Sequence, residues 1–156
     1  SGSEDGFDTL WVLAPNPVFT LPGDIDLVGA FSKIKNVVYV ADADDETAQF
    51  CNWVVPSAHP LEAWGDVRSF DGTYGVCQPQ IASLLGGRSL IEVVSILADL
   101  SPRDGQSWVK QTAAGIAGGN LSERLWKEIL HNGFLADSGY KAAQVNIVTE
   151  RPVAKA

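Results

Sequence analysis

The sequence contains no methionine, two cysteines and two histidines in 156 residues. Cys51 and Cys77 could form at most one disulfide, whereas structural zinc and iron–sulfur sites usually take four grouped ligands. His59 and His131 are far apart and have no thiol or carboxylate at ligand spacing. The chain by itself is therefore not expected to hold a metal ion or cluster.

Cations are also scarce. There are 11 lysines and arginines against 19 acids, which gives a net charge of -8 and a pI of about 4.5. This balance opposes association with a phosphate backbone, so we expect no nucleic-acid partner. No apolar run approaches the ~18 residues of a transmembrane helix, so direct membrane insertion is not expected. The polar start, residues 1–6, has neither an initiator methionine nor a signal peptide, and we interpret it as a leader or cloning remnant before an excised fragment.

Hydrophobic residues make up 46% of the sequence, enough to build a core. Residues 7–140 are expected to form a single α/β domain, with residues 141–156 as a tail. Short apolar runs that suit strands buried on both faces alternate with helical patterns. The strands are expected at residues 9–13, 36–40 and 52–55, and the helices at residues 24–34 and 44–50. This order predicts a three-layer, doubly wound, mainly parallel sheet with helices on both faces.

The second half has helical patterns. Residues 89–100 begin with the capping box Ser89 and Glu92. A helix interrupted by glycine is expected at 106–117, and another at 121–131, opened by Asn120 or Ser122 and stopped by Asn132-Gly133. Residues 143–148 fit either a final strand or a frayed tail.

Ligands of open parallel sheets bind beyond the carboxyl ends of the strands. These ends are residues 14–17, 41–45 and 56 onward, and from Pro56 a polar, glycine-punctuated loop is expected to run to Gln80. Asp42 stands where a carboxylate often binds a nucleotide ribose or base, although no G-x-G-x-x-G follows the first strand. The acidic run 42–46 lacks the calcium-loop pattern and favours a helix start.

Other chemically suggestive groups have structural interpretations. Glu62 and Asp66 have a spacing that suits acid–base chemistry, but a salt bridge with Arg68 is the favoured interpretation. Cys51 is expected to be a packed thiol, and His131 a cation at a helix end. No catalytic triad, nucleophile elbow or P-loop is present.

Several short motifs occur in a characteristic order: Asn16-Pro17, Asp42, Glu46-Thr47-Ala48, NWVVPSAHPLEAWGD at 52–66, Gly72 and Gln78-Pro79. In this order they resemble the third domain of large subunits in the molybdopterin oxidoreductase (dimethyl-sulfoxide reductase) superfamily. The stretches NPVFTLPGDIDL, QPQIASLLGGRS and LWKEILHNGFLADS are most similar to the molybdopterin-oxidoreductase-like iron–sulfur subunit of alternative complex III.

The resemblance implies a domain of a respiratory electron-transfer subunit whose strand-end loops correspond to a pyranopterin guanine dinucleotide site. The parent would be an oxidoreductase with iron–sulfur clusters elsewhere, and the isolated fragment would be inactive. It would lie on the periplasmic side of the bacterial inner membrane, with the parent's other domains and membrane-complex subunits as partners. The corresponding cofactor-binding residues are Asn16, Asp42, Thr47, Glu62 and Gln78. The alternative is a cofactor-free structural scaffold domain of a quinol-oxidising alternative complex III subunit, a branch in which the molybdenum cofactor is thought to be lost.

Overall fold

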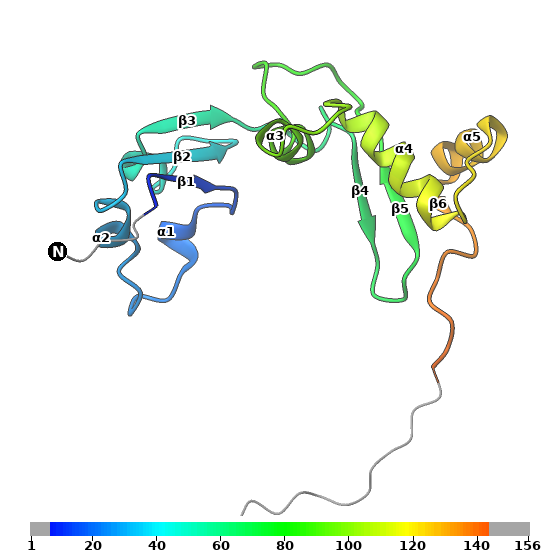
Figure 1. The fold of residues 1–156 in the computed structure, drawn as a ribbon, viewed down its shortest axis with the longest axis horizontal. Coiled ribbons are helices and arrows are strands. Elements are labelled where there is room, and N and C mark those ends of the chain that lie inside the picture. The colour runs from blue at the N-terminus through cyan, green and yellow to red at the C-terminus, as the bar shows by residue number, and fades with distance from the viewer. Residues whose placement is uncertain (1–6, 144–156) are drawn as a thin grey trace, which may run out of the picture.

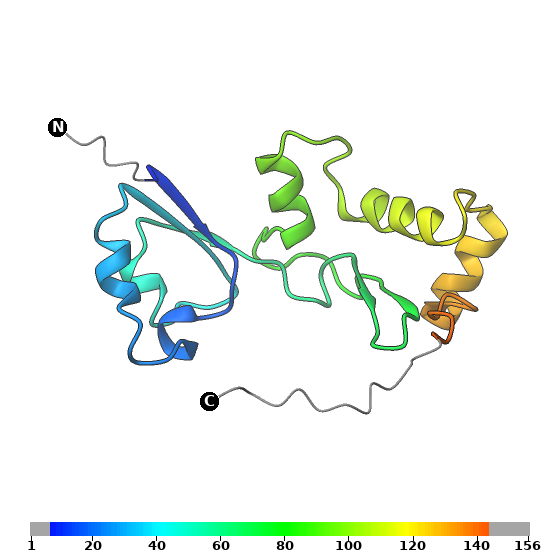
Figure 2. The same cartoon turned by 60° about the horizontal axis from the view of Figure 1, so that its bottom comes forward.

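The computed structural model describes residues 7–143, which form two lobes joined in an arch (Figures 1 and 2). The N-terminal lobe, residues 7–56, holds a parallel sheet and short helices. Its elements are β1 (Thr9–Val12), α1 (Pro17–Thr20), α2 (Leu27–Phe31), β2 (Asn36–Ala41), the 3₁₀ helix η1 (Ala48–Phe50) and β3 (Trp53–Pro56). The C-terminal lobe, residues 57–143, contains β4 (Gly65–Arg68), β5 (Tyr74–Cys77), α3 (Leu90–Leu97), α4 (Gly105–Ile116), α5 (Glu123–Asn132) and β6 (Phe134–Leu135).

The parallel sheet has the strand order β1-β2-β3, and its strands match the three apolar runs expected from the sequence. Alternation along β2 sends Val37, Tyr39 and Ala41 to one face, where they pack in a core with Val12 and Phe31. Both figures show α1 and α2 on the same side of the sheet. The parallel arrangement of these strands is therefore confirmed.

The prediction of a three-layer, doubly wound sheet with helices on both faces is wrong. A doubly wound sheet needs a reversal of strand order, whereas successive right-handed crossovers in the order β1-β2-β3 place their connections on one face. On the other face, Trp11, Val38 and Trp53 form one row across the strands. We call this the open face. Trp53 is 65% exposed there.

The helices of the N-terminal lobe are shorter than the sequence pattern predicts. Asp26, rather than Asp24, caps α2 through a hydrogen bond from the Gly29 N–H at 2.8 Å. In place of a helix over residues 44–50 there is only η1, preceded by a turn in which Asp45 accepts backbone hydrogen bonds. A carboxylate that caps a turn in this way competes with continuation of a regular helix.

A second, antiparallel sheet has the order β4-β5-β6, and its strands β4 and β5 lie within the stretch expected to be a long loop. Its hairpin turns at Asp71-Gly72. Gly72 has a φ of 87°, and a Cβ at this position would lie 2.6 Å from the Tyr140 ring. Glycine is therefore required both by the backbone conformation and by the packing.

The helices of the C-terminal lobe follow the sequence closely. Ser89 and Glu92 form the expected capping box on α3, Ser122 caps α5, and α5 ends at Gly133 in the left-handed conformation. Helices α4 and α5 pack with β5 in a second core around Tyr74, Val109, Trp126 and Ile129. No helix in residues 7–143 is both long enough and apolar enough to cross a bilayer. Residues 144–148 of the last expected strand lie outside the described part.

The lobes meet where residues 86–88 run beside the end of β3. Ser57 and Arg88 form a parallel bridge, with backbone hydrogen bonds from Ala58 to Arg88 and from Arg88 to Pro56. A Cβ on Gly87 would lie 2.6 Å from the Ser57 carbonyl oxygen, so this approach also needs glycine.

Candidate functional site

Asn16 and Thr47 meet at the carboxyl end of the parallel sheet. The Thr47 hydroxyl donates to Asn16 Oδ1 at 2.9 Å and accepts the Val18 N–H at 3.1 Å, and Thr47 is fully buried. Asn16 has left-handed backbone angles, φ 39° and ψ 60°, a region in which asparagine is enriched among non-glycine residues. This contact joins the loop after β1 to the segment after β2.

Tyr39 and Asp45 extend the same network. The Tyr39 hydroxyl accepts the Asn16 N–H at 2.9 Å and donates to Asp45 Oδ2 at 2.7 Å. Asp45 Oδ1 accepts the N–H groups of Thr47 and Ala48 at 2.9 and 3.1 Å. Burial, then the hydrogen bond to Asp45, raises the pKa of Tyr39 to about 12. We call these four residues, Asn16, Tyr39, Asp45 and Thr47, the strand-end network.

Two further acids lie beside the strand-end network. Glu46 Oε2 accepts the Asn16 Nδ2–H at 2.7 Å, and this hydrogen bond lowers the pKa of Glu46. Asp42 directly follows Ala41, which pairs with Pro56 at the ends of β2 and β3. Its side chain is exposed and makes no hydrogen bond with another residue in the 7–143 range. Asp42 is thus a solvent-exposed carboxylate at this edge, as are Asp44 and Glu46.

Glu62 and Gln78, also expected at the site, have separate structural contacts. Glu62 Oε1 accepts the Leu84 N–H at 3.4 Å and lines a small cavity with Arg88 and Glu92. Gln78 Nε2 donates to the Leu130 carbonyl at 2.9 Å, near the end of α5. Of the five residues inferred from the resemblance, the structure therefore joins only Asn16 and Thr47 by a hydrogen bond.

The expected salt bridge of Arg68 with Glu62 or Asp66 is absent from the described residues. Arg68 instead donates to the carbonyls of Gly72 and Ser138 at 3.0 and 3.2 Å, and its guanidinium lies 4.5 Å from the Tyr140 ring centre. Arg68 and Asp66 share a face of β4, but the Arg68 side chain extends toward the turn of the hairpin. Two carbonyl oxygens and one aromatic ring interact with its guanidinium there.

The remaining candidate residues, Cys51, His59 and His131, have structural roles within their own segments. Cys51 is half-buried, its thiol donates to the Thr47 carbonyl at 3.2 Å, and burial raises its pKa. His59 Nδ1 accepts the Leu61 N–H, and His131 lies in the last turn of α5, as expected. Within residues 7–143 there is no group of three or more His, Cys, Asp or Glu side chains that could hold a metal ion.

The residues at the sheet edge do not fit a guanine dinucleotide well. Most hydrogen-bonding groups of the Asn16 and Thr47 side chains are already used by each other, by Val18 or by Glu46, which leaves few for a ligand. Asp42, Asp44, Asp45 and Glu46 gather negative charge at this edge, which opposes the binding of phosphate groups there. The strand order also provides no reversal point, which is where ligands of doubly wound sheets bind.

Neither a scan against protein-family models nor a search of curated proteins found a match to this sequence.

Tyr39 and Asp45 were missed as members of the network. Tyr39 occupies an inward position of a strand of β-branched residues, and a tyrosine hydroxyl in such a place usually needs a partner. The acidic run after the strand supplies that partner. The pairing of a buried tyrosine with an acid six residues later was therefore a usable signal.

Proposed function

We propose that this chain is a domain of a molybdopterin oxidoreductase-type subunit of a respiratory electron-transfer complex, and that it acts there as a cofactor-free structural scaffold. The parent class rests on the order of the sequence motifs given above. The other domains of the parent and the membrane-complex subunits would be its partners, on the periplasmic side of the membrane.

The scaffold role rests mainly on the closed strand-end network. A site that binds a dinucleotide needs polar groups left over for the ligand, whereas here the hydroxyls of Tyr39 and Thr47 and the Asn16 amide bond to one another or to adjacent carboxylates. Groups satisfied in this way hold two loops together, which is a structural task.

One observation favours the second candidate, a pyranopterin guanine dinucleotide site. The Asp42 carboxylate is exposed at the sheet edge, and a carboxylate can accept hydrogen bonds from a guanine or ribose. In that case the dinucleotide would bring chemistry centred on molybdenum, and Asp42 would orient its guanosine end.

Calorimetric titration with GDP separates the two candidates. For the scaffold we expect no binding tighter than about 0.1 mM, since the acids at residues 42–46 repel phosphate. Asp42→Ala should then change nothing, and Asp24→Asn, an exposed acid elsewhere in the lobe, serves as the matched control. Micromolar binding that Asp42→Ala abolishes and Asp24→Asn preserves would instead favour the dinucleotide site.

A further inference from the structure

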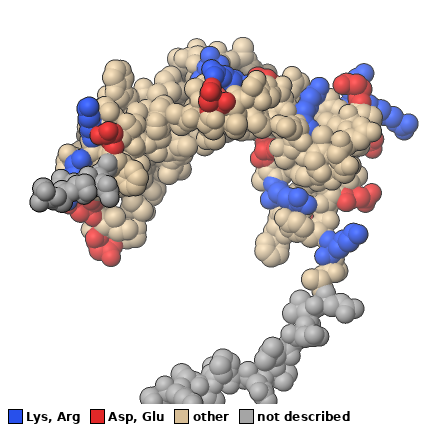
Figure 3. Space-filling model, viewed as in Figure 1, with Lys and Arg blue, Asp and Glu red and all other residues tan. Residues whose placement is uncertain are grey.

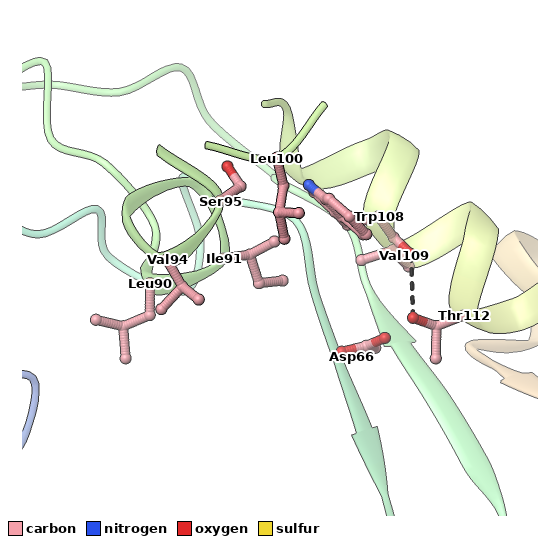
Figure 4. Close-up of a pocket in the computed structure, with 9 residues that line it drawn as sticks. All are labelled: Asp66, Leu90, Ile91, Val94, Ser95, Leu100, Trp108, Val109 and Thr112. Carbon is pink, nitrogen blue, oxygen red and sulfur yellow. Dashed lines mark hydrogen bonds between the residues drawn. The ribbon is translucent and has the colours of Figure 1, made fainter. Parts of the chain in front are cut away.

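An apolar groove of about 410 Å³ lies between α3, α4 and β4 in the C-terminal lobe (Figure 4). Its walls are the side chains of Leu90, Ile91, Val94, Leu100 and Trp108, and Asp66 stands at its floor. Figure 4 shows these side chains on α3, on the segment that follows it and on α4, with the Asp66 carboxylate below them on β4. The groove is far from the strand-end network in sequence and belongs to the other lobe.

Asp66 leaves a negative charge at the floor of this groove. Its Oδ2 accepts the Tyr74 hydroxyl at 2.7 Å. No lysine, arginine or histidine nitrogen of residues 7–143 comes within 4.0 Å of it. A partly buried carboxylate without a counter-ion is unfavourable, and a cation brought into the groove would relieve this cost.

Trp108 adds a second unsatisfied group. Its indole Nε1 is buried and has no hydrogen-bond partner within the described range. An unpaired buried donor is unfavourable. The groove therefore offers an occupant the Asp66 carboxylate in apolar surroundings, with the Trp108 ring in one wall.

The apolar surface continues past the groove along α3. Six of the eight residues in this helix are aliphatic, and four of them, Leu90, Val94, Ile96 and Leu97, are 44–46% exposed. Leu84 and Leu85 in the preceding loop are 75% and 82% exposed. A helix that is apolar all round is typical of a protein interior. This surface is larger than a small ligand would cover, which points to a polypeptide occupant.

The charge of the chain argues against a second copy as that occupant. Two copies would each bring a net charge of -8 and a carboxylate without a counter-ion to the interface. Figure 3 shows broad uncharged areas on the molecule with charged groups only in small clusters between them. A partner with apolar side chains and one cation complements both features.

We propose that the groove between α3, α4 and β4 is a docking site for an amphipathic helix of another polypeptide, whose apolar face covers α3 and whose lysine or arginine pairs with Asp66. The apolar side chains of such a helix, at i, i+3, i+4 and i+7, would lie between α3 and α4. This docking site is independent of the function proposed above.

The test uses a synthetic amphipathic peptide of about 18 residues, or five helical turns, with leucines on one face and a central lysine at the edge of that face. A control peptide carries glutamate in place of the lysine. We expect the lysine peptide to bind the chain in fluorescence anisotropy at least tenfold more tightly than the glutamate peptide. Asp66→Asn, which retains an acceptor for Tyr74, should remove that preference, and Asp24→Asn should preserve it.

Two further measurements locate the contact. Val94→Asp, at an exposed position of α3, should abolish binding of both peptides while circular dichroism shows the fold unchanged. The indole N–H signal of Trp108, assigned by its loss in Trp108→Phe, should shift when the lysine peptide is added. Equal binding of both peptides, an unchanged preference in Asp66→Asn, or no binding at all would overturn the proposal. Self-association that Val94→Asp abolishes would assign the groove to a second copy instead.

Discussion

At the residue scale, the buried hydroxyls of Tyr39 and Thr47 explain how two separate loops are held at one sheet edge. Each hydroxyl both donates and accepts: Tyr39 links Asn16 to Asp45, and Thr47 links Asn16 to Val18. A substitution that removes either hydroxyl leaves a buried donor or acceptor unpaired. The polar residues at this edge are thus needed for the fold itself.

The raised pKa of Tyr39 predicts a loss of stability in alkali. Its pKa rises from 10.0 to about 12 on folding. The stabilisation is therefore complete below about pH 10 and is lost as the pH rises through 12, because the unfolded chain ionises first. The loss should be on the order of 2 kcal/mol. Urea unfolding between about pH 9 and pH 12 should show a smaller loss for Tyr39→Phe than for the wild type; identical pH slopes would contradict the assignment.

At the element scale, the helices of the C-terminal lobe begin and end at sequence signals that act locally. Ser89 accepts the Glu92 N–H at 3.2 Å, and Glu92 accepts the Ser89 N–H at 2.9 Å, so both ends of the capping box are closed. The cap matters more here than in an average helix, because much of the apolar surface of α3 is exposed and packing stabilises it less.

Ser89→Ala should therefore lower the free energy of unfolding by about 1 kcal/mol, with Ser89→Thr close to the wild type. Urea unfolding followed by circular dichroism measures both. An alanine variant as stable as the wild type would mean that α3 does not depend on its cap.

The sequence could predict the elements that depend on local patterns, but not those that depend on tertiary arrangement. The three parallel strands are short apolar runs and the caps are local patterns, so both could be recognised without tertiary information. The hairpin of β4 and β5 was missed although Asp71-Gly72 lies between Val67 and Tyr74, a pattern typical of a tight turn. The one-sided sheet could not be predicted, because it depends on the direction in which each crossover moves rather than on any local pattern.

At the scale of the whole molecule, the described residues contain two separate hydrophobic cores. One surrounds Val37 and Tyr39 in the N-terminal lobe, and the other surrounds Val109 and Trp126 in the C-terminal lobe. The lobes share a covalent link and a few backbone hydrogen bonds, among them those from the Ser57 N–H to the Ala41 carbonyl and from the Arg88 N–H to the Pro56 carbonyl. Units that share so few contacts are expected to open separately.

Two matched cavity variants test this independence. Val109→Ala and Val37→Ala should each cost about 2 kcal/mol, because both side chains are almost completely buried. In amide hydrogen exchange, Val109→Ala should speed exchange in α4, α5 and β5 and leave β1 and β2 unchanged, and Val37→Ala should do the reverse. Faster exchange throughout residues 7–143 in either variant would show one cooperative unit.

On the open face of the parallel sheet, an exposed side chain is not necessarily one that tolerates substitution. Val38 and Val40 are only 8% and 5% exposed, although α1 and α2 lie on the opposite side. Trp11 and Trp53 stand on either side of Val38 in the same row, and large side chains in such cross-strand positions can cover a smaller one between them. Their exposed area would suggest that both tryptophans are dispensable, but replacing them with small polar residues would let water reach the open face of β2.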